Sequence, residues 1–336
     1  MMFPGQNSQA AGMGEEAYYN PAVKEEVKRI FDAGSLIIEE DLAEICFGNQ
    51  TGKLDTSLVQ PAIVAAELAN YRLMRKRGLS PVLIMGHSLG EIAALGAAEA
   101  LSIEDVFEIT KVRMNVTKQA GIDHPGRMAA VIGLTKEQLD PIMASANMHL
   151  RKLGESSSAY AANHNWRLEQ VLSGHPDALE RVQRTVKRLK GMNLIGRAGV
   201  VKLKVPGAFH SPHNEGGIEE LREAFELASK KIPKVLLLNN KGDYILNPDN
   251  YADYYAEQLV NGVEWRLMMH QAAYDGISDF VEVRLQDDPT KATLSNFVKN
   301  EFDGNYQEVS TEYGEVIRLN WTPELSKDME RQLKAA

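Results

Sequence analysis

The sequence has a single cysteine, no long apolar run and no excess of basic residues. Cys46 alone cannot form an intramolecular disulfide, and the chain has no Cys/His cluster at zinc-ligand spacing. No apolar run approaches the roughly 18 residues that span a bilayer, and the N-terminus lacks the basic and apolar regions of a secretory signal. These absences predict a soluble, cytoplasmic protein with no structural metal and no membrane partner.

The charge balance is acidic. The 336 residues contain 37 Lys and Arg against 46 Asp and Glu, which gives a formal net charge of −9. Dedicated nucleic-acid binders carry a basic surface, so the sequence predicts no nucleic-acid partner. With 44% apolar residues, the chain is long enough to bury a large core.

Helix-like and strand-like segments alternate along the chain, which favours an α/β fold. The strand pattern appears at 81–85, 234–239 and 278–283. The helical pattern appears at 21–32, 60–77, 91–98, 103–120, 215–230, 251–261 and 264–275.

Residues 127–205 follow a different order. Strands are expected at 127–134, 158–163, 169–174 and 199–205, with helices at 135–146 and 175–189. This βαββαβ order is typical of ferredoxin-like folds. We therefore predict a small ferredoxin-like subdomain at 127–205, inserted into a larger subdomain formed by 1–126 and 206–300, with a C-terminal extension at 301–336.

The segment Gly86-His87-Ser88-Leu89-Gly90 fits the pattern Gly-x-Ser-x-Gly. Small flanking residues allow the sharp strand-to-helix turn that exposes a nucleophilic serine, and the helix start supplies amide donors for a developing oxyanion. A strand is expected before this segment and a helix after it, as the mechanism requires. The alternative is a glycine-rich turn capped by a serine without catalytic function.

A nucleophilic serine needs a base. His210 follows the predicted strand 199–205 and the Pro206-Gly207 turn, so it lies on a connection where the sites of α/β proteins gather. His213, three residues further on, is the nearest rival. A histidine on a loop can also be an ordinary solvated side chain.

Five segments together resemble the malonyl-CoA:acyl-carrier-protein transacylase family, which includes acyltransferases of polyketide synthesis. They agree with the family in order and spacing, and the resemblance covers about residues 3–300. The segments are FPGQNSQAAGMG at 3–14, QPAIVAAELA at 60–69, GHSLGEIAAL at 86–95, KVRMNV at 111–116 and GAFHSP at 207–212.

The resemblance implies a fold and a reaction. The family has an α/β-hydrolase-like large subdomain with a ferredoxin-like insertion. It implies that Ser88 is acylated by a coenzyme A thioester and deacylated by the phosphopantetheine thiol of an acyl carrier protein, with His210 as general base and then acid. No bound cofactor is expected, and coenzyme A enters only as part of the substrate.

The resemblance also implies which groups surround this Ser-His dyad. The backbone amides of Gln6 and Leu89 would hold the oxyanion. In the family a backbone carbonyl orients the histidine, and the matching motif here assigns this role to Asn240, or otherwise to Asn239.

The resemblance assigns Arg113 to the free carboxylate of a malonyl group, since a planar guanidinium can donate two parallel hydrogen bonds to it. The alternative is an arginine on an exposed helix face. Phe209 matches a position where a bulky aromatic residue favours malonyl over methylmalonyl. Four further residues match family positions: Gln60 and His87 beside the acyl group, and Asn163 and Asn165 at the cleft edge. For these four, a structural role and a catalytic role both stay open.

Residues 181–204 contain eight Lys or Arg and no Asp or Glu. Because carrier proteins are usually acidic, this segment is a candidate docking face on the small subdomain. The alternative is a solvated helix face.

Several positions depart from the family pattern. Asn7 replaces a usual glycine, which a left-handed backbone would tolerate. Trp166-Arg167 stands in place of a Ser-Pro turn, Arg284 lies where a Gly-Pro-Gly turn is common, and the first strand is shortened to Met1–Phe3. These departures suggest a divergent member, for which a substituted malonyl unit stays open.

Two other functions stay open from the sequence. A thioester hydrolase could use the same Ser88 and His210, although Arg113 argues for a carboxylated acyl group. A non-catalytic docking subunit is disfavoured because both residues are present. Neither the pathway, fatty acid or polyketide, nor the particular carrier and oligomeric state follow from the sequence.

Overall fold

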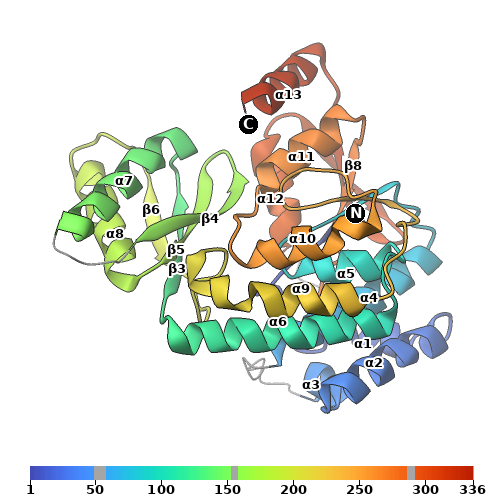
Figure 1. Ribbon diagram of the computed structural model, residues 1–336. Helices are drawn as coiled ribbons and strands as arrows, with labels where there is room; N and C mark the ends of the chain where they lie inside the picture. Colours follow the sequence, from blue (N-terminus) through green and yellow to red (C-terminus); the bar gives the residue numbers. More distant parts are fainter. Residues whose placement is uncertain (49–57, 153–157, 286–291, 336) are drawn as a thin grey trace.

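The computed structural model describes residues 1–48, 58–152, 158–285 and 292–335. Helices and strands combine in a mixed α/β architecture (Figure 1). A four-stranded sheet with two helices lies to one side of a larger part that contains both termini (Figure 1).

A small parallel sheet forms the centre of the larger part. Its order is β1-β2-β7, with β1 at Met2–Phe3, β2 at Leu83–Gly86 and β7 at Leu236–Leu238. All of β2 is buried, which explains its continuous apolar sequence. The backbone amide of Val283 donates to Met2 O at 2.9 Å and so connects this sheet to the next.

That second sheet is antiparallel and has the order β8-β10-β9, with β8 at Asp279–Val281, β9 at Tyr306–Thr311 and β10 at Gly314–Leu319. Thus the segment predicted as a C-terminal extension supplies two strands. It also supplies core residues, because Leu319 and Met329 pack in one buried cluster with Met2 and Met85.

Helices surround these sheets. α5 is buried at every residue, in keeping with its alanine-rich sequence, and carries one charged side chain, Glu91. Across the described residues, no helix is long and apolar enough to cross a membrane. The helices are α1 (Glu15–Tyr19), α2 (Lys24–Ile38), α3 (Leu42–Phe47), α4 (Val59–Lys76), α5 (Gly90–Ala97), α6 (Ile103–Asp123), α9 (Ile218–Leu227), α10 (Tyr251–Ala256), α11 (Trp265–Tyr274), α12 (Thr293–Glu301) and α13 (Pro323–Ala335), with short 3-10 helices η1 (Pro212–Gly217), η2 (Pro248–Asn250) and η3 (Glu257–Leu259).

The inserted segment has its own sheet and core. In chain order it contains β3 (Arg127–Ile132), α7 (Lys136–Lys152), β4 (Ala159–Trp166), β5 (Glu169–Gly174), α8 (Pro176–Gly191) and β6 (Gly199–Lys202). This is the strand and helix order predicted from the sequence. The sheet is antiparallel with the order β4-β5-β3-β6. Its core includes Leu179, Val182 and Val186, which share one face of α8.

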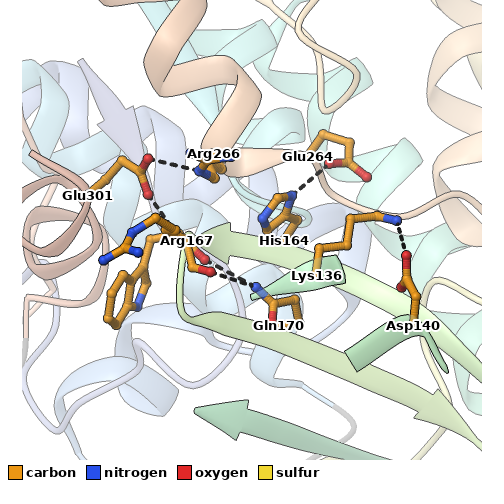
Figure 2. Close-up of polar contacts among 9 residues, drawn as sticks. Lys136, Asp140, His164, Arg167, Gln170, Glu264, Arg266 and Glu301 are labelled. Atoms are coloured by element: carbon orange, nitrogen blue, oxygen red, sulfur yellow. Dashed lines mark hydrogen bonds and ion pairs between the residues drawn. The ribbon is translucent and has the colours of Figure 1, made fainter. Parts of the chain in front are cut away.

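Direct hydrogen bonds join the two parts along β4. The amide of His164 donates to Val263 O, and the amide of Val263 donates to Ala162 O, both at 2.8 Å. Figure 2 shows His164 pointing to Glu264, with 3.3 Å between His164 Nδ1 and Glu264 Oε2. Strand β4 is therefore fixed to the segment that precedes α11.

The turn between β4 and β5 is also held by the larger part. Glu301 accepts from the Arg167 amide at 2.6 Å, from Arg266 Nε at 2.8 Å and from His270 Nε2 at 2.7 Å (Figure 2 draws the first two). Its side chain is only 3% exposed. A buried carboxylate thus fixes the Trp166-Arg167 turn.

Candidate active site

Ser88 occupies the sharp turn between β2 and α5. Its φ is +54°, a left-handed conformation that a serine rarely adopts. A Cβ on Gly86 would lie 2.2 Å from the backbone carbon of Gly90, and one on Gly90 would lie 2.2 Å from Phe3 O. Both glycines are therefore required by close backbone packing, and the turn has the geometry of a nucleophile elbow.

The hydroxyl of Ser88 meets His210. Ser88 Oγ lies 2.7 Å from His210 Nε2. His210 Nδ1 lies 2.9 Å from Gln258 O and 3.0 Å from Asn261 O. Because carbonyl oxygens only accept, Nδ1 carries the proton, and Nε2 is left to accept from the serine.

His210 is neutral near neutral pH, so its Nε2 is free to accept a proton. Burial, followed by the charge of Arg113, lowers the pKa of His210 to about 3, so the ring is neutral at pH 7. The rival His213 is less buried and contacts Ser211 and the rings of His124 and Tyr160. The structure thus brings His210, not His213, to Ser88.

The prediction that the Asn240 carbonyl orients the histidine is wrong. The carbonyls that accept from His210 Nδ1 belong to Gln258 and Asn261, in and just after η3. The Asn240 carbonyl instead accepts from the amide of Glu264 at 2.8 Å. Asn239, the alternative, closes a local turn, with its side chain accepting from two backbone amides.

Arg113 lies in the interior beside Ser88, not on an exposed helix face. It is 3% exposed and comes from the buried face of α6. Its Nη2 lies 3.2 Å from Ser88 Oγ, and its Nη1 donates to Gln60 Oε1 at 2.7 Å. Burial lowers the pKa of Arg113 to about 10, which leaves the guanidinium charged at neutral pH.

The other predicted positions lie around the same point. Gln60 donates from Nε2 to Thr117 Oγ1 at 3.0 Å, so both ends of its carboxamide are used. His87 Nε2 lies 3.0 Å from Asn165 Oδ1. Burial lowers the pKa of His87 to about 4, so this ring too is neutral. His87 and Asn165 therefore connect the turn beside Ser88 to β4.

A cavity of about 220 Å³ opens over Ser88 between the two parts of the molecule. Its polar lining includes Gln6, Asn163, Asn165 and Glu169. Its apolar wall comes from both parts and includes Met128, Ala130, Val171, Leu203, Val205, Phe209, Leu294 and Phe297.

Two backbone amides are available at the serine. A Cβ on Gly5 would lie 2.7 Å from His87 O and 3.7 Å from Leu89 N, so the Gln6 loop packs directly on the serine turn. Within the described ranges, neither the Gln6 amide nor the Leu89 amide has a protein acceptor. These are the donors expected for an oxyanion.

Two departures from the family pattern have structural explanations. Asn7 has φ +79°, the left-handed conformation in which an asparagine in place of glycine is tolerated. Arg284 does not line the cavity over Ser88 but a separate one of about 850 Å³. Its carbonyl accepts from Asn70 Nδ2 at 2.7 Å.

The basic segment 181–204 covers one helix face and the loop after it. Arg184, Lys187 and Arg188 on α8 are exposed. Elsewhere in the segment Lys202 pairs with Glu180 at 3.5 Å, where both side chains are at least half exposed. The positive charge thus faces solvent. Among the residues that the structure describes, no group of three or more His, Cys, Asp and Glu side chains could hold a metal ion.

Sequence reasoning missed three residues of the site. Gln258 and Asn261 act through their carbonyls, for which no sequence signal exists because every residue has one. Glu91 lies beneath Ser88 and is 2% exposed. Glu91 could have been found as the one charged residue in an apolar helix. Acidic residues are common at the start of helices, however, so this pattern did not indicate a role in the site.

Comparison with known proteins adds independent findings. A model of the family described as "Acyl transferase domain" matches residues 1–301. The malonyl CoA-acyl carrier protein transacylase of Staphylococcus aureus (strain MRSA252) is 30% identical over 84% of this chain and 87% of its own length. The protein of the same name from Bacillus subtilis is 28% identical over 84% and 85%.

The solved structures include similar folds. The malonyl CoA-acyl carrier protein transacylase of Clostridium perfringens superposes with a TM-score of 0.78 at 25% identity, covering 99% of this chain and 96% of that one.

Proposed function

The chain belongs to the acyl transferase domain family, as its match over residues 1–301 shows, and on this premise we propose that it moves a malonyl group from coenzyme A to the phosphopantetheine thiol of an acyl carrier protein. The names of its relatives from two bacteria support this substrate pair. One observation carries the proposal: Ser88 Oγ lies 2.7 Å from His210 Nε2 and 3.2 Å from Arg113 Nη2. The base and the cation proposed to bind the acyl carboxylate thus both contact the nucleophilic oxygen of Ser88.

In the first half-reaction Ser88 Oγ attacks the thioester carbonyl while His210 Nε2 takes its proton. The tetrahedral intermediate collapses, the carbon–sulfur bond breaks, and His210 returns the proton to the departing coenzyme A thiolate. The malonyl group remains as an ester on Ser88. The carbonyls of Gln258 and Asn261 hold the protonated Nδ1 and stabilise the imidazolium.

The oxyanion of that intermediate is held by the amides of Gln6 and Leu89. Both come from segments packed against the serine turn, so they need no rearrangement as charge develops. Each such donor contributes about 3 kcal/mol to stabilising the transition state.

In the second half-reaction the thiol of the carrier protein enters the same cavity. His210 takes the thiol proton, the thiolate attacks the Ser88 ester, and the proton returns to Ser88 Oγ. The reaction is ping-pong, and coenzyme A serves only as substrate. No bound cofactor takes part in either step.

Arg113 selects an acyl group with a free carboxylate. Its contact to Ser88 Oγ points to where an acyl group would be attached. The neighbouring terminal nitrogen, Nη1, donates to Gln60 Oε1, and the fork formed by Nη1 and Nη2 of a guanidinium can hold a carboxylate with two hydrogen bonds. Gln60 positions this fork.

Phe209 limits the space beside the α-carbon of the acyl group. It lines the cavity with Met128 and Val171, and it packs in a cluster with Ala130 and Ala162. Malonyl is therefore the proposed substrate, and an alkyl-substituted malonyl is the variant that the assay must compare. One methyl group in a pocket changes binding by only about 1–3 kcal/mol.

The carrier docks on the basic face of residues 181–204. Exposed cations at Arg184, Lys187 and Arg188 attract an acidic partner and raise the rate of encounter.

The architecture supports the division predicted from the sequence. We assign residues 127–205 to a ferredoxin-like small subdomain, because the strand order β4-β5-β3-β6 with two helices fits that fold. Residues 1–126 and 206–300 form the α/β-hydrolase-like catalytic subdomain, and the segment after residue 300, predicted as an extension, completes that subdomain with β9 and β10.

A loading and transfer assay tests the proposal. The protein is incubated with malonyl-CoA, methylmalonyl-CoA or acetyl-CoA, adducts are measured by mass spectrometry, and carrier protein with its phosphopantetheine arm is then added. We expect fast malonyl loading and transfer to the carrier. Rapid loss of the acyl group to water without carrier would indicate a thioester hydrolase instead, and the absence of any adduct would indicate a non-catalytic subunit.

A further inference from the structure

A buried hydrogen-bonded group lies beneath the candidate dyad. Glu91, at the start of α5, is 2% exposed. Its Oε1 accepts from the Asn240 amide at 2.6 Å, and its Oε2 accepts from the side-chain amides of Asn240 and Gln258. All three partners are N–H donors, so the Glu91 carboxyl group acts as the acceptor for Asn240 and Gln258.

Gln258 connects Glu91 to Ser88 and Arg113 through its side chain and to His210 through its backbone carbonyl. Its Nε2 donates to Ser88 O at 2.8 Å as well as to Glu91. Its Oε1 accepts from Arg113 Nη2 at 3.2 Å and from Arg113 Nε at 3.3 Å. The backbone carbonyl of the same residue accepts from His210 Nδ1.

These contacts fix the orientation of the carboxamide. A carboxamide offers N–H donors on one side and a carbonyl acceptor on the other. Only one orientation turns the acceptor to the Arg113 donors and the donors to Ser88 O and Glu91. Reversing it would oppose donor to donor at Arg113 and acceptor to acceptor at Glu91. Glu91 therefore holds Gln258 in this orientation together with Arg113 and Ser88 O.

We propose that Glu91 and the Gln258 side chain are positioning residues that lock the Arg113 guanidinium against the Ser88–His210 pair. Recognition of the acyl carboxylate and alignment of the reacting groups are thereby coupled through one buried amide. The inference rests on the proposed function, because it assigns Arg113 to the acyl carboxylate.

The coupling has a specific consequence. Acetyl loading requires Ser88, His210 and the oxyanion donors, whereas malonyl loading also requires Arg113 in place. Loss of the Glu91 carboxylate removes one of the two acceptors that hold Gln258 Nε2, so the carboxamide holds the guanidinium less firmly. Malonyl loading then falls more than acetyl loading, which general destabilisation of the fold would not produce.

The test uses Glu91→Gln, Gln258→Leu and the double variant. Rates of Ser88 acylation are measured by rapid quench and mass spectrometry with malonyl-CoA and acetyl-CoA, on protein shown by circular dichroism to be folded. We expect each single variant to lower the malonyl rate about ten-fold or more, since the hydrogen bonds that hold the charged Arg113 guanidinium are disturbed. The malonyl-to-acetyl ratio should fall with it.

The double variant shows whether the two residues act as one unit. If they do, it should be no more than about two-fold slower than the slower single variant. Gln258→Leu keeps the backbone carbonyl that His210 uses. If Glu91→Gln does not fold, the malonyl-to-acetyl ratio of Gln258→Leu tests the inference by itself.

Glu67→Gln is the matched control. Glu67 is a buried glutamate of α4 whose carboxylate oxygens have no hydrogen-bond partner within the described part of the chain, and it should keep both rates within about two-fold of wild type. An unchanged malonyl-to-acetyl ratio in folded Glu91→Gln and Gln258→Leu, or additive losses in the double variant, would overturn the inference. Failure of the wild-type protein to load malonyl would instead overturn the proposed function.

Discussion

Arg113 and Ser88 are 25 residues apart in the chain, yet Nη2 of the arginine lies 3.2 Å from Oγ of the serine. The arginine comes from the middle of α6 and the serine from the turn before α5. A fixed positive charge at the oxygen that would carry the acyl group is unnecessary for a simple ester intermediate. It becomes useful when the acyl group carries a negative charge of its own.

Replacement of Arg113 by alanine should separate malonyl from acetyl loading. Loss of a charged hydrogen-bonded pair of about 3 kcal/mol corresponds to roughly a hundred-fold lower malonyl rate, while acetyl loading should change only a few-fold. Single-turnover acylation with both thioesters measures this. Lys118→Ala, an exposed cation on the same helix, is the control. Equal losses with both thioesters would remove the assignment of the arginine to the carboxylate.

Stability should fall on acidification because two neutral histidines are buried at the site. Burial lowers the pKa of His87 to about 4, against 6.5 for an ordinary histidine. Between these values the unfolded chain binds protons that the folded chain does not, so the free energy of unfolding decreases as pH falls. The full effect of each such group is about 1.4 kcal/mol per unit of pKa difference.

Urea unfolding at several pH values measures this dependence. His87→Gln should show a shallower loss of stability with acid than wild type, whereas the exposed His124→Gln should match wild type. Identical pH dependence in wild type and His87→Gln would show that His87 is not held neutral.

Glu301 should be important for stability because it accepts three hydrogen bonds in a buried position, two of which are drawn in Figure 2. Glu301→Gln places an N–H donor against other donors, and breaking such a buried pair costs about 3–5 kcal/mol. Denaturant unfolding should show this loss, with faster amide exchange in the β4–β5 turn. Glu308→Gln, which breaks a more exposed pair with Lys299, should cost less than about 1 kcal/mol. Equal small losses would contradict the role of Glu301.

The basic face should affect the carrier and not coenzyme A. Reversal of Arg184, Lys187 and Arg188 to glutamate is expected to raise the KM for the carrier about ten-fold at low salt, because it removes electrostatic attraction. Loading from malonyl-CoA should be unchanged. The matched control reverses three exposed cations of α2, Lys24, Lys28 and Arg29. An unchanged KM, or the same change in the control, would exclude this face as the docking site.

The sequence predicted best what depends on neighbouring residues. The turn around Ser88 follows from two glycines whose absent side chains make room for backbone. The βαββαβ order followed from alternating patterns that were long enough to recognise. In contrast, α1 and α3 are five and six residues long, too short for helical periodicity to be visible.

Partners that are distant in sequence were harder to predict. His210 and Ser88 are separated by 122 residues, so the place of His210 after a predicted strand left His213 as a rival, and the family resemblance decided between them. The orienting carbonyls were misassigned to Asn240, since a backbone group has no residue-type signal. The β9–β10 hairpin had a readable pattern, with alternating side chains around Gly314, but it lies beyond the region that resembles the family.

Peptide-mapping mass spectrometry after brief exposure to malonyl-CoA tests the central claim most directly. The account predicts a malonyl ester on the peptide that contains Ser88 and on no other, its absence in Ser88→Ala, and its removal when carrier protein is added. A malonyl group on another residue, or a Ser88→Ala variant that still transfers malonyl at the wild-type rate, would contradict it.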